Sequence, residues 1–131
     1  MSVRRFSASD AKFYQFKDRQ IFVGDVLDSS NSDAMSVGFY RNRIKGERND
    51  WLVTYDEVLV VTKGALTVRH EGGATTAHAG AVIFLTKGTR IAYEAAEDDT
   101  EVVYVTHPHW LEAQQRSEHA ALLDDYHPAA D

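Results

Sequence analysis

One acidic residue, Glu57, interrupts an otherwise apolar stretch in the middle of the chain. It lies in YDEVLVVTKG, residues 55–64, whose alternating apolar side chains are typical of a half-buried strand. Strand alternation puts six residues on one face: Trp51, Val53, Tyr55, Glu57, Leu59 and Val61. If that face lines the protein interior, the Glu57 carboxyl group loses its hydration. Desolvation raises its pKa and suits it to general acid or base chemistry near neutral pH.

Two tyrosines could complete such a site. Tyr55 precedes Glu57 by two residues on the same face, and Tyr93 is expected on an opposing strand. Glu57 is therefore the candidate acid or base, and Tyr55 and Tyr93 are its candidate catalytic partners. In the alternative interpretation Glu57 is ionised and pairs with Arg41 or Arg43, and this buried pair orders the fold without doing chemistry.

Five further residues are candidates for ligand binding. Arg41 and Arg43 alternate on one face of SVGFYRNRIKG, residues 36–46, and could form a fork for a carboxylate or phosphate. A solvated outer face is the simpler interpretation for at least one of the two. Trp51, Tyr40 and Tyr104 could supply the walls of a pocket. They could equally be packing residues, because aromatic side chains favour strands.

Short strands must position these residues. From residue 37 onward, strand-like segments are separated by glycine-bearing turns at Gly64, Gly72, Gly73, Gly80 and Gly88, which predicts an all-β fold. Residues 1–36 form an N-terminal segment that contains one further strand, RQIFVGDVLDSS. Residues 110–127 change to a weak helical period, and Pro128 is expected to end this helix.

Two glycine-anchored blocks carry a resemblance to a known family. EVLVVTKGALTV, in which Glu57 precedes Gly64 by seven residues, and GAVIFLTKGTRI, in which Gly80 precedes Gly88 by eight, resemble the paired motifs of the cupin superfamily. YDEVLVVTKGALTVRHEG, AGAVIFLTKGTRIAY and VVYVTHPHW resemble the cupin domain of the ethanolamine-utilisation protein Q (EutQ) family, over roughly residues 37–110. The resemblance implies a single cupin-type jelly-roll β-barrel with a short C-terminal helix, a ligand in the barrel mouth, and a role in amine or ethanolamine metabolism.

Metal binding is not expected. The resemblance to cupins implies two histidines before the glutamate and a third after the second motif, but those positions hold Trp51, Val53 and Ile91. Glu57 alone cannot hold a transition metal tightly. His107 and His109 flank Pro108 far along the chain from Glu57, and surface histidines are the simpler interpretation of this pair. We therefore predict neither a metal nor another cofactor.

Composition limits the partners. A chain of 131 residues with 44% hydrophobic content is long enough for one core, so residues 1–131 are expected to form one domain. The net charge of -6 and the lack of a basic run argue against nucleic acid and anionic membranes. The chain has no cysteine and no apolar segment long enough for a membrane span, which indicates a soluble, cytoplasmic protein.

Cupins commonly dimerise, so a homodimer is expected, in which residues before Val37 could add a strand to a partner sheet.

Three functions follow from these observations. The leading hypothesis is a small metal-independent EutQ-like cupin that binds a small polar or anionic metabolite around Glu57. The first alternative is an enzyme that uses Glu57 as acid or base, of isomerase, lyase or epimerase type. Acetate kinase activity, which the resemblance also implies, is less favoured because the glycines are spaced as hairpin turns and not as a phosphate-binding loop. The second alternative is a structural or assembly cupin whose barrel is filled by Trp51, Leu59, Val61, Phe84 and Ile91.

Overall fold

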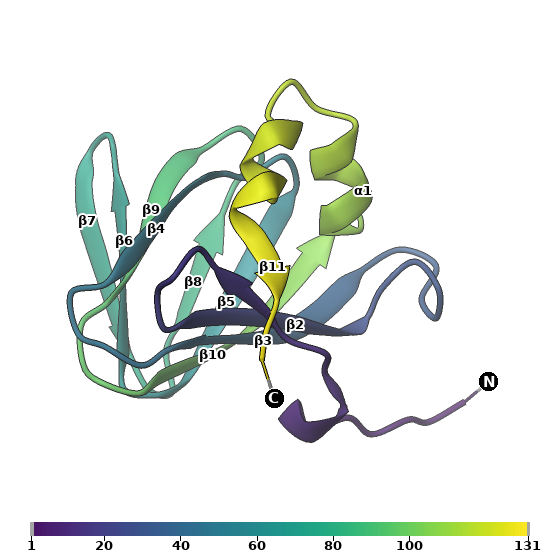
Figure 1. The fold of residues 1–131 in the computed structure, drawn as a ribbon, viewed down its shortest axis with the longest axis horizontal. Coiled ribbons are helices and arrows are strands. Elements are labelled where there is room, and N and C mark those ends of the chain that lie inside the picture. Colours follow the sequence, from purple (N-terminus) through teal and green to yellow (C-terminus); the bar gives the residue numbers. More distant parts are fainter. Residues whose placement is uncertain (1, 131) are drawn as a thin grey trace.

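The computed structural model describes residues 2–130, which fold into two antiparallel sheets that face each other (Figure 1). The strand order is β11-β1-β2-β3-β10-β5-β8 in the seven-stranded sheet and β4-β9-β6-β7 in the four-stranded sheet. The two sheets do not close into one continuous hydrogen-bonded barrel. This is the two-sheet jelly roll that the sequence predicts.

The elements are short. The seven-stranded sheet contains β1 (Tyr14–Phe16), β2 (Ile21–Leu27), β3 (Ser36–Asn42), β5 (Asp56–Lys63), β8 (Val82–Leu85), β10 (Thr100–His107) and β11 (Tyr126–Pro128). The four-stranded sheet contains β4 (Arg48–Leu52), β6 (Ala65–His70), β7 (Gly73–His78) and β9 (Arg90–Ala95). Three short helices complete the described chain: η1 (Ala8–Asp10), α1 (Trp110–Gln115) and η2 (Ala120–Asp125).

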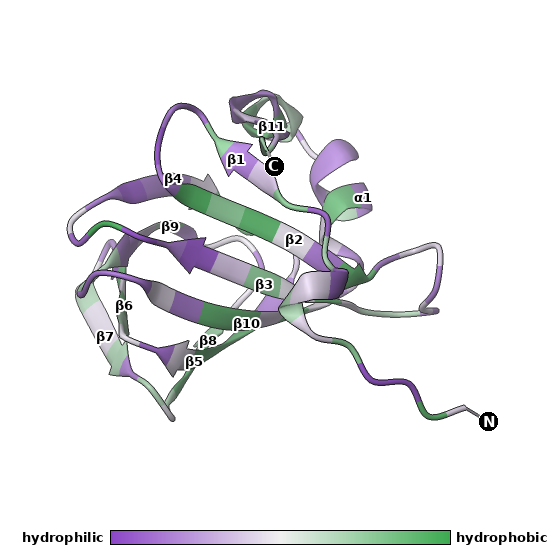
Figure 2. Cartoon of the chain, turned by 60° about the horizontal axis from the view of Figure 1, so that its bottom comes forward, coloured by the Kyte–Doolittle hydropathy of each residue, from purple (hydrophilic) through white to green (hydrophobic). Residues whose placement is uncertain are grey.

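The core lies between the sheets because alternate side chains of each strand point inward. Leu59 and Val61 of β5 and Leu66 and Val68 of β6 are all buried. Apolar residues are also prominent along β2 and β10 (Figure 2). One core assignment from the sequence is wrong: Phe84 is 61% exposed. On β8 it is Ile83 and Leu85 that point inward, so Phe84 cannot fill the interior.

Glycine turns connect the strands as predicted. Gly64, Gly80 and Gly88 have φ values of 73°, 96° and 93°, in the region that favours glycine. Gly64 links β5 to β6 and thus one sheet to the other. A Cβ atom at Gly64 would also lie 2.7 Å from Thr100 Oγ1, so both conformation and space require glycine there.

The segment from Trp51 to Val61 is two strands and not one. β4 ends at Leu52 in the four-stranded sheet, and β5 begins at Asp56 in the seven-stranded sheet. Backbone bonds from Val53 N–H to the Thr89 carbonyl (3.1 Å) and from Gly88 N–H to the Val53 carbonyl (2.7 Å) hold the crossing between them. All six residues predicted to share the inner face are nevertheless buried, because the chain crosses over the core between the two strands.

The C-terminal tail differs from the predicted helix. α1 ends at Gln115, where the Ser117 hydroxyl donates to the Gln114 carbonyl (2.7 Å) and accepts from His119 N–H (3.0 Å). A serine that bonds the backbone in this way competes with helix continuation. The chain then forms η2 and β11, which pairs with β1. Pro128 lies in this edge strand instead of ending a helix, and an edge strand tolerates proline.

The N-terminal strands have partners within the chain. β1 pairs with β11 and β2, and β2 pairs with β3. The addition of a strand from residues before Val37 to a partner sheet stays a prediction, as does the homodimer itself. No helix among residues 2–130 has the length and apolar character that a membrane span requires.

Candidate functional site

A small cavity of about 40 Å³ lies between the two sheets. This volume exceeds the roughly 10–15 Å³ that a cavity needs to hold one water molecule. Six residues that the sequence singled out line it together: Tyr40, Trp51, Tyr55, Glu57, Tyr93 and Tyr104. Strands from both sheets supply them, so the fold gathers a site from residues that are distant in sequence.

The centre of the site is the Glu57 carboxyl group. Glu57 is only 5% exposed, and Tyr93 from the opposite sheet donates a hydrogen bond to its Oε1 at 2.5 Å. Burial raises the pKa of Glu57 from its ordinary value of 4.5 to about 7, although the bond from Tyr93 acts in the opposite direction. Near neutral pH both the acid and the carboxylate forms are therefore populated.

Tyr55 presents a hydroxyl group to the same space. Trp51 Nε1 donates to the Tyr55 hydroxyl oxygen at 2.8 Å. Burial, together with the nearby charge of Glu57, raises the pKa of Tyr55 well above its usual range, as it also does for Tyr93. Both hydroxyls thus stay protonated; Tyr93 donates to Glu57, and Tyr55 accepts from Trp51.

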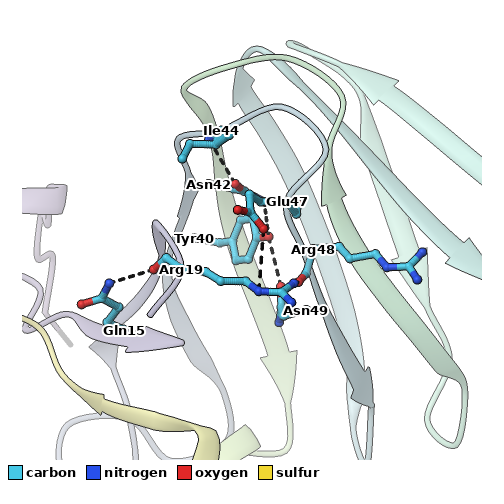
Figure 3. Close-up of polar contacts among 8 residues, drawn as sticks. All are labelled: Gln15, Arg19, Tyr40, Asn42, Ile44, Glu47, Arg48 and Asn49. Carbon is cyan, nitrogen blue, oxygen red and sulfur yellow. Dashed lines mark hydrogen bonds and ion pairs between the residues drawn. The ribbon is translucent and has the colours of Figure 1, made fainter. Parts of the chain in front are cut away.

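A second chain of hydrogen bonds, drawn in Figure 3, joins Asn42, Tyr40 and Asn49, of which Tyr40 and Asn49 line the cavity. The Tyr40 hydroxyl donates to Asn49 Oδ1 at 3.2 Å, and Asn42 Nδ2 donates to the Tyr40 hydroxyl at 3.3 Å. Asn49 Nδ2 in turn donates to the Tyr126 hydroxyl at 3.0 Å. This chain fixes Tyr40 and links β4 to the C-terminal strand β11.

The C-terminal tail forms part of the cavity wall. Trp110 and Tyr126 both line the cavity, and both rings stand edge-on to Trp51, with centroid distances of 6.3 and 5.8 Å. Figure 1 shows α1 and the chain that follows it lying together beside the sheets. The tail is therefore a component of the site and not an appendage.

Asp25 ties that tail to the sheet. Its carboxylate accepts hydrogen bonds from the Tyr104 hydroxyl and from Trp110 Nε1, the latter at 2.9 and 3.1 Å to its two oxygens. Burial raises the pKa of Asp25, while both hydrogen bonds oppose that shift. One carboxylate thus holds a β10 residue and the first residue of α1 together.

The two arginines are not part of the cavity, which corrects their assignment as ligand clamps. Arg41 lies on the outer face of β3, with its Nε 3.9 Å from Glu101 and its guanidinium 4.8 Å from the centroid of the Phe13 ring. Arg43 pairs with Asp99 at 3.4 Å in an exposed position. Neither pairs with Glu57, so the buried arginine–glutamate pair is also excluded.

The residues around Glu57 do not fit a divalent metal. Trp51, Val53 and Ile91 are buried apolar side chains without ligand atoms for a metal, and the one carboxyl group present is bonded to a tyrosine hydroxyl. Between residues 2 and 130 no three His, Cys, Asp or Glu side chains come together as a metal site would need. His109 bonds the Ser32 carbonyl at 2.8 Å, and His107 is exposed.

Four polar or aromatic residues at the site were not singled out from the sequence: Asp25, Asn49, Trp110 and Tyr126. Asp25 carries the same signal as Glu57, a single acid within an apolar strand, IFVGDVL. Trp110 and Tyr126 lie at the two ends of the tail, for which the sequence pattern predicts a helix. The bonds to Asp25 hold Trp110 at the cavity, and the return of the chain to pair with β1 brings Tyr126 there.

Comparison with known proteins agrees with this architecture. The family described as ethanolamine utilisation protein EutQ matches residues 6–112, and so includes the N-terminal strands. Acetate kinase EutQ of Escherichia coli is 28% identical over 109 residues, which are 81% of this chain and 46% of that protein. The chain thus spans about half the length of this curated relative.

Solved structures give the same result. A structure of ethanolamine utilization protein Q from Salmonella typhimurium superposes with a TM-score of 0.62 at 30% identity, covering 68% of this chain and 70% of that one. The Cnp3 cupin domain of Schizosaccharomyces pombe, at 10% identity and a TM-score of 0.64 over 86% of this chain and 79% of its own, shows the shared cupin fold. With a family match over most of its length and this fold, the chain belongs to the EutQ family of cupins.

Proposed function

We propose that this protein binds a small polar metabolite in the cavity between its sheets, without a metal, in ethanolamine-type catabolism. The observation that carries the proposal is the buried Glu57 carboxyl group, which faces a small cavity and has a pKa of about 7. A buried ionisable group with a shifted pKa costs stability, and such groups concentrate at functional sites. The family to which the chain belongs supplies the metabolic setting.

Several features of the cavity favour a ligand over a purely structural interior. Space remains beside Glu57, whereas a structural barrel would be filled. Tyr55 accepts a bond from Trp51, and among residues 2–130 no acceptor for its own proton is found, so this proton is available to a ligand. Because the cavity is small, two-carbon metabolites are the first class of ligand to test.

Binding can be tested through the two tryptophans, because both of them line the cavity. Their two indole N–H resonances in a ¹⁵N NMR spectrum report on the site. The probes are ethanolamine, acetaldehyde, acetate and ethanol. At least one should give a saturable shift that Glu57→Gln weakens and that Glu101→Gln, on the outer face of β10, leaves unchanged. Saturable shifts with none of the four, or equal shifts in Glu57→Gln, contradict the proposal.

A second candidate is acid–base catalysis by Glu57. A group with a pKa of about 7 can both take and return a proton at neutral pH. Such a base exchanges the acidic C–H protons of a bound aldehyde with solvent. Acetaldehyde in D₂O should then lose its methyl protons faster with the wild-type protein than with Glu57→Gln. Equal rates rule out this role for the tested substrate class.

Acetate kinase activity, the name given to the E. coli relative, is less favoured for these residues. The lining of the cavity contains no Lys, Arg or His to stabilise phosphate charge.

The metal-independent part of the proposal has its own test. Elemental mass spectrometry of tag-free protein, purified without chelator, should find less than about a tenth of an equivalent of any transition metal. A near-stoichiometric metal contradicts this part of the proposal and makes the histidines the candidate metal ligands.

A further inference from the structure

The cavity combines one carboxyl group with an unusually aromatic wall. Seven of its thirteen lining residues are Tyr or Trp. The rings do not stack into a filled interior. Trp51 meets Tyr126 at 85° and Trp110 at 69°, and Tyr40 meets Tyr93 at 42°. These ring pairs are tilted or edge-on instead of parallel, and all of these rings line the cavity beside Glu57.

Among the residues that line the cavity, the only charge near neutral pH is negative. Glu57 is the only lining residue that ionises near neutral pH, because the tyrosines that line the cavity all have raised pKa values and no Lys, Arg or His is among the lining residues. The faces of aromatic rings attract cations through the ring quadrupole. An anion here would meet a carboxylate and no compensating positive charge, whereas a cation would meet favourable groups on every side.

We propose that the ligand of this cavity is a small organic ammonium ion, held by the Glu57 carboxylate and the faces of the surrounding aromatic rings. This inference rests on the binding function proposed above and names the chemical class of its ligand. It also replaces the anionic ligand that the arginines suggested, since Arg41 and Arg43 lie outside the cavity. Tyr55, with a free hydroxyl proton, can bind a hydroxyl or carbonyl oxygen on the same ligand.

The cavity is small, at about 40 Å³, so small ammonium ions such as methylammonium and ethylammonium are the first ligands to test. Each alkyl group on the nitrogen also removes an N–H group that could donate to the Glu57 carboxylate. Affinity should therefore decrease as alkyl groups are added to the nitrogen.

Ammonium binding must depend on pH through Glu57. Only its carboxylate form attracts the cation, so affinity should rise with pH through about 7, where Glu57 ionises. The other titratable groups that line the cavity with Glu57 are tyrosines: Tyr55 two residues before it, Tyr40 on β3, Tyr93 on β9, Tyr104 on β10 and Tyr126 on β11. Asp25 on β2 bonds Tyr104 and Trp110 of this lining. The tyrosines stay neutral in this range, and comparison with Glu57→Gln separates the contribution of Asp25.

The test compares three probes of similar size and different charge: ethylammonium chloride, ethanol and sodium acetate, at equal ionic strength. The readout is the pair of tryptophan indole N–H resonances at pH 8. Ethylammonium should give a saturable shift with an affinity at least about tenfold higher than that of ethanol, a factor that corresponds to about 1.4 kcal/mol. Glu57→Gln should remove at least this factor, and Glu101→Gln should have no effect.

The outcomes separate this inference from the binding function itself. Equal affinities for ethylammonium and ethanol, or a shift with acetate alone, overturn the ammonium class and leave the binding function standing. No shift with any probe overturns both. If Glu57→Gln does not fold, the affinity of the wild-type protein for ethylammonium is measured at pH 8 and at pH 6 instead. The affinity should be lower at pH 6, and a constant affinity overturns the inference.

Discussion

The Tyr93 hydroxyl donates a hydrogen bond of 2.5 Å to the Glu57 carboxyl group, and this bond joins β9 of one sheet to β5 of the other. Both residues are buried, at 7% and 5% exposure. The bond stabilises the carboxylate form, whereas burial favours the neutral acid. The balance of these two effects leaves a carboxyl group that changes its charge close to physiological pH.

Removing the tyrosine hydroxyl should shift that balance. In Tyr93→Phe the carboxylate loses its hydrogen-bond donor while burial remains, so the pKa of Glu57 should rise above about 7. A ¹³C NMR titration of the glutamate side-chain carboxyl measures it. An unchanged or lower pKa in the variant contradicts the role of Tyr93.

The raised pKa of Glu57 should make the folded state less stable as pH rises. The unfolded chain loses this proton near 4.5, and the folded chain keeps it until about 7. Between these values the folded state binds more protons, so the free energy of unfolding falls by up to about 3 kcal/mol from pH 4.5 to pH 7 and then stays level. The contribution is isolated as the difference between wild type and Glu57→Gln in urea unfolding at several pH values. A difference that does not vary with pH rejects this coupling.

Asp25 should matter for stability more than a typical surface aspartate. In Asp25→Ala the Tyr104 hydroxyl and Trp110 Nε1 both lose their acceptor, which should cost about 2 kcal/mol and loosen the tail. Asp28→Ala is the matched control, since the Asp28 side chain bonds only to Ser30, in an exposed position, and should cost less than about 1 kcal/mol. Urea unfolding followed by far-UV circular dichroism compares them. Equal costs for the two variants would show that Asp25 does not hold the tail.

Gly38 should not tolerate a side chain. A Cβ atom there would overlap the Tyr104 hydroxyl and the Gly24 carbonyl oxygen, neither of which can move without breaking the site. Gly38→Ala should therefore lower the free energy of unfolding by about 3 kcal/mol or more. Gly72→Ala is the control, because its Cβ would be 3.5 Å from the nearest atom, His70 Nδ1, an ordinary contact. A Gly38→Ala protein as stable as the control would contradict the packing described for Tyr104.

Arg41 should be dispensable for ligand binding. It lies on the outer face of β3 with Glu101 and Phe13, so Arg41→Gln should leave the affinity for any cavity ligand unchanged within about twofold. Its cost in stability should be less than about 1 kcal/mol, as for most partly exposed ion pairs. An affinity loss of tenfold or more in Arg41→Gln would mean that Arg41 contributes to ligand binding.

The pattern of strands and turns could be predicted from the sequence because it depends on local rules. Turn glycines such as Gly64 and Gly88 can be recognised from their spacing between the strand-like segments. Alternation correctly predicted that Trp51, Tyr55 and Glu57 are all buried, although they do not belong to one strand. Alternation does not say which face of a strand points inward. On β3 the inner face carries Tyr40 and Asn42, whose polar atoms are bonded inside, and so the arginines point out.

The tail could not be predicted by the same rules. Residues 110–127 have a weak helical period, but α1 stops after Gln115 and the chain returns to pair with β1. That return depends on tertiary contacts: buried Gln114 accepts a bond from Thr54 at 2.8 Å, and Asn49 bonds Tyr126 at 3.0 Å. Local propensity contains neither contact, so Trp110 and Tyr126 were missed as site residues.

The most direct test of the central claim is a ¹³C NMR titration of the Glu57 side-chain carboxyl in the wild-type protein, assigned by its absence in Glu57→Gln. A buried acid beside Tyr93 should titrate with a midpoint near 7. A midpoint near the ordinary value of 4.5 would mean that Glu57 is solvated and ionised, and would contradict both the cavity chemistry and the ligand class inferred from it.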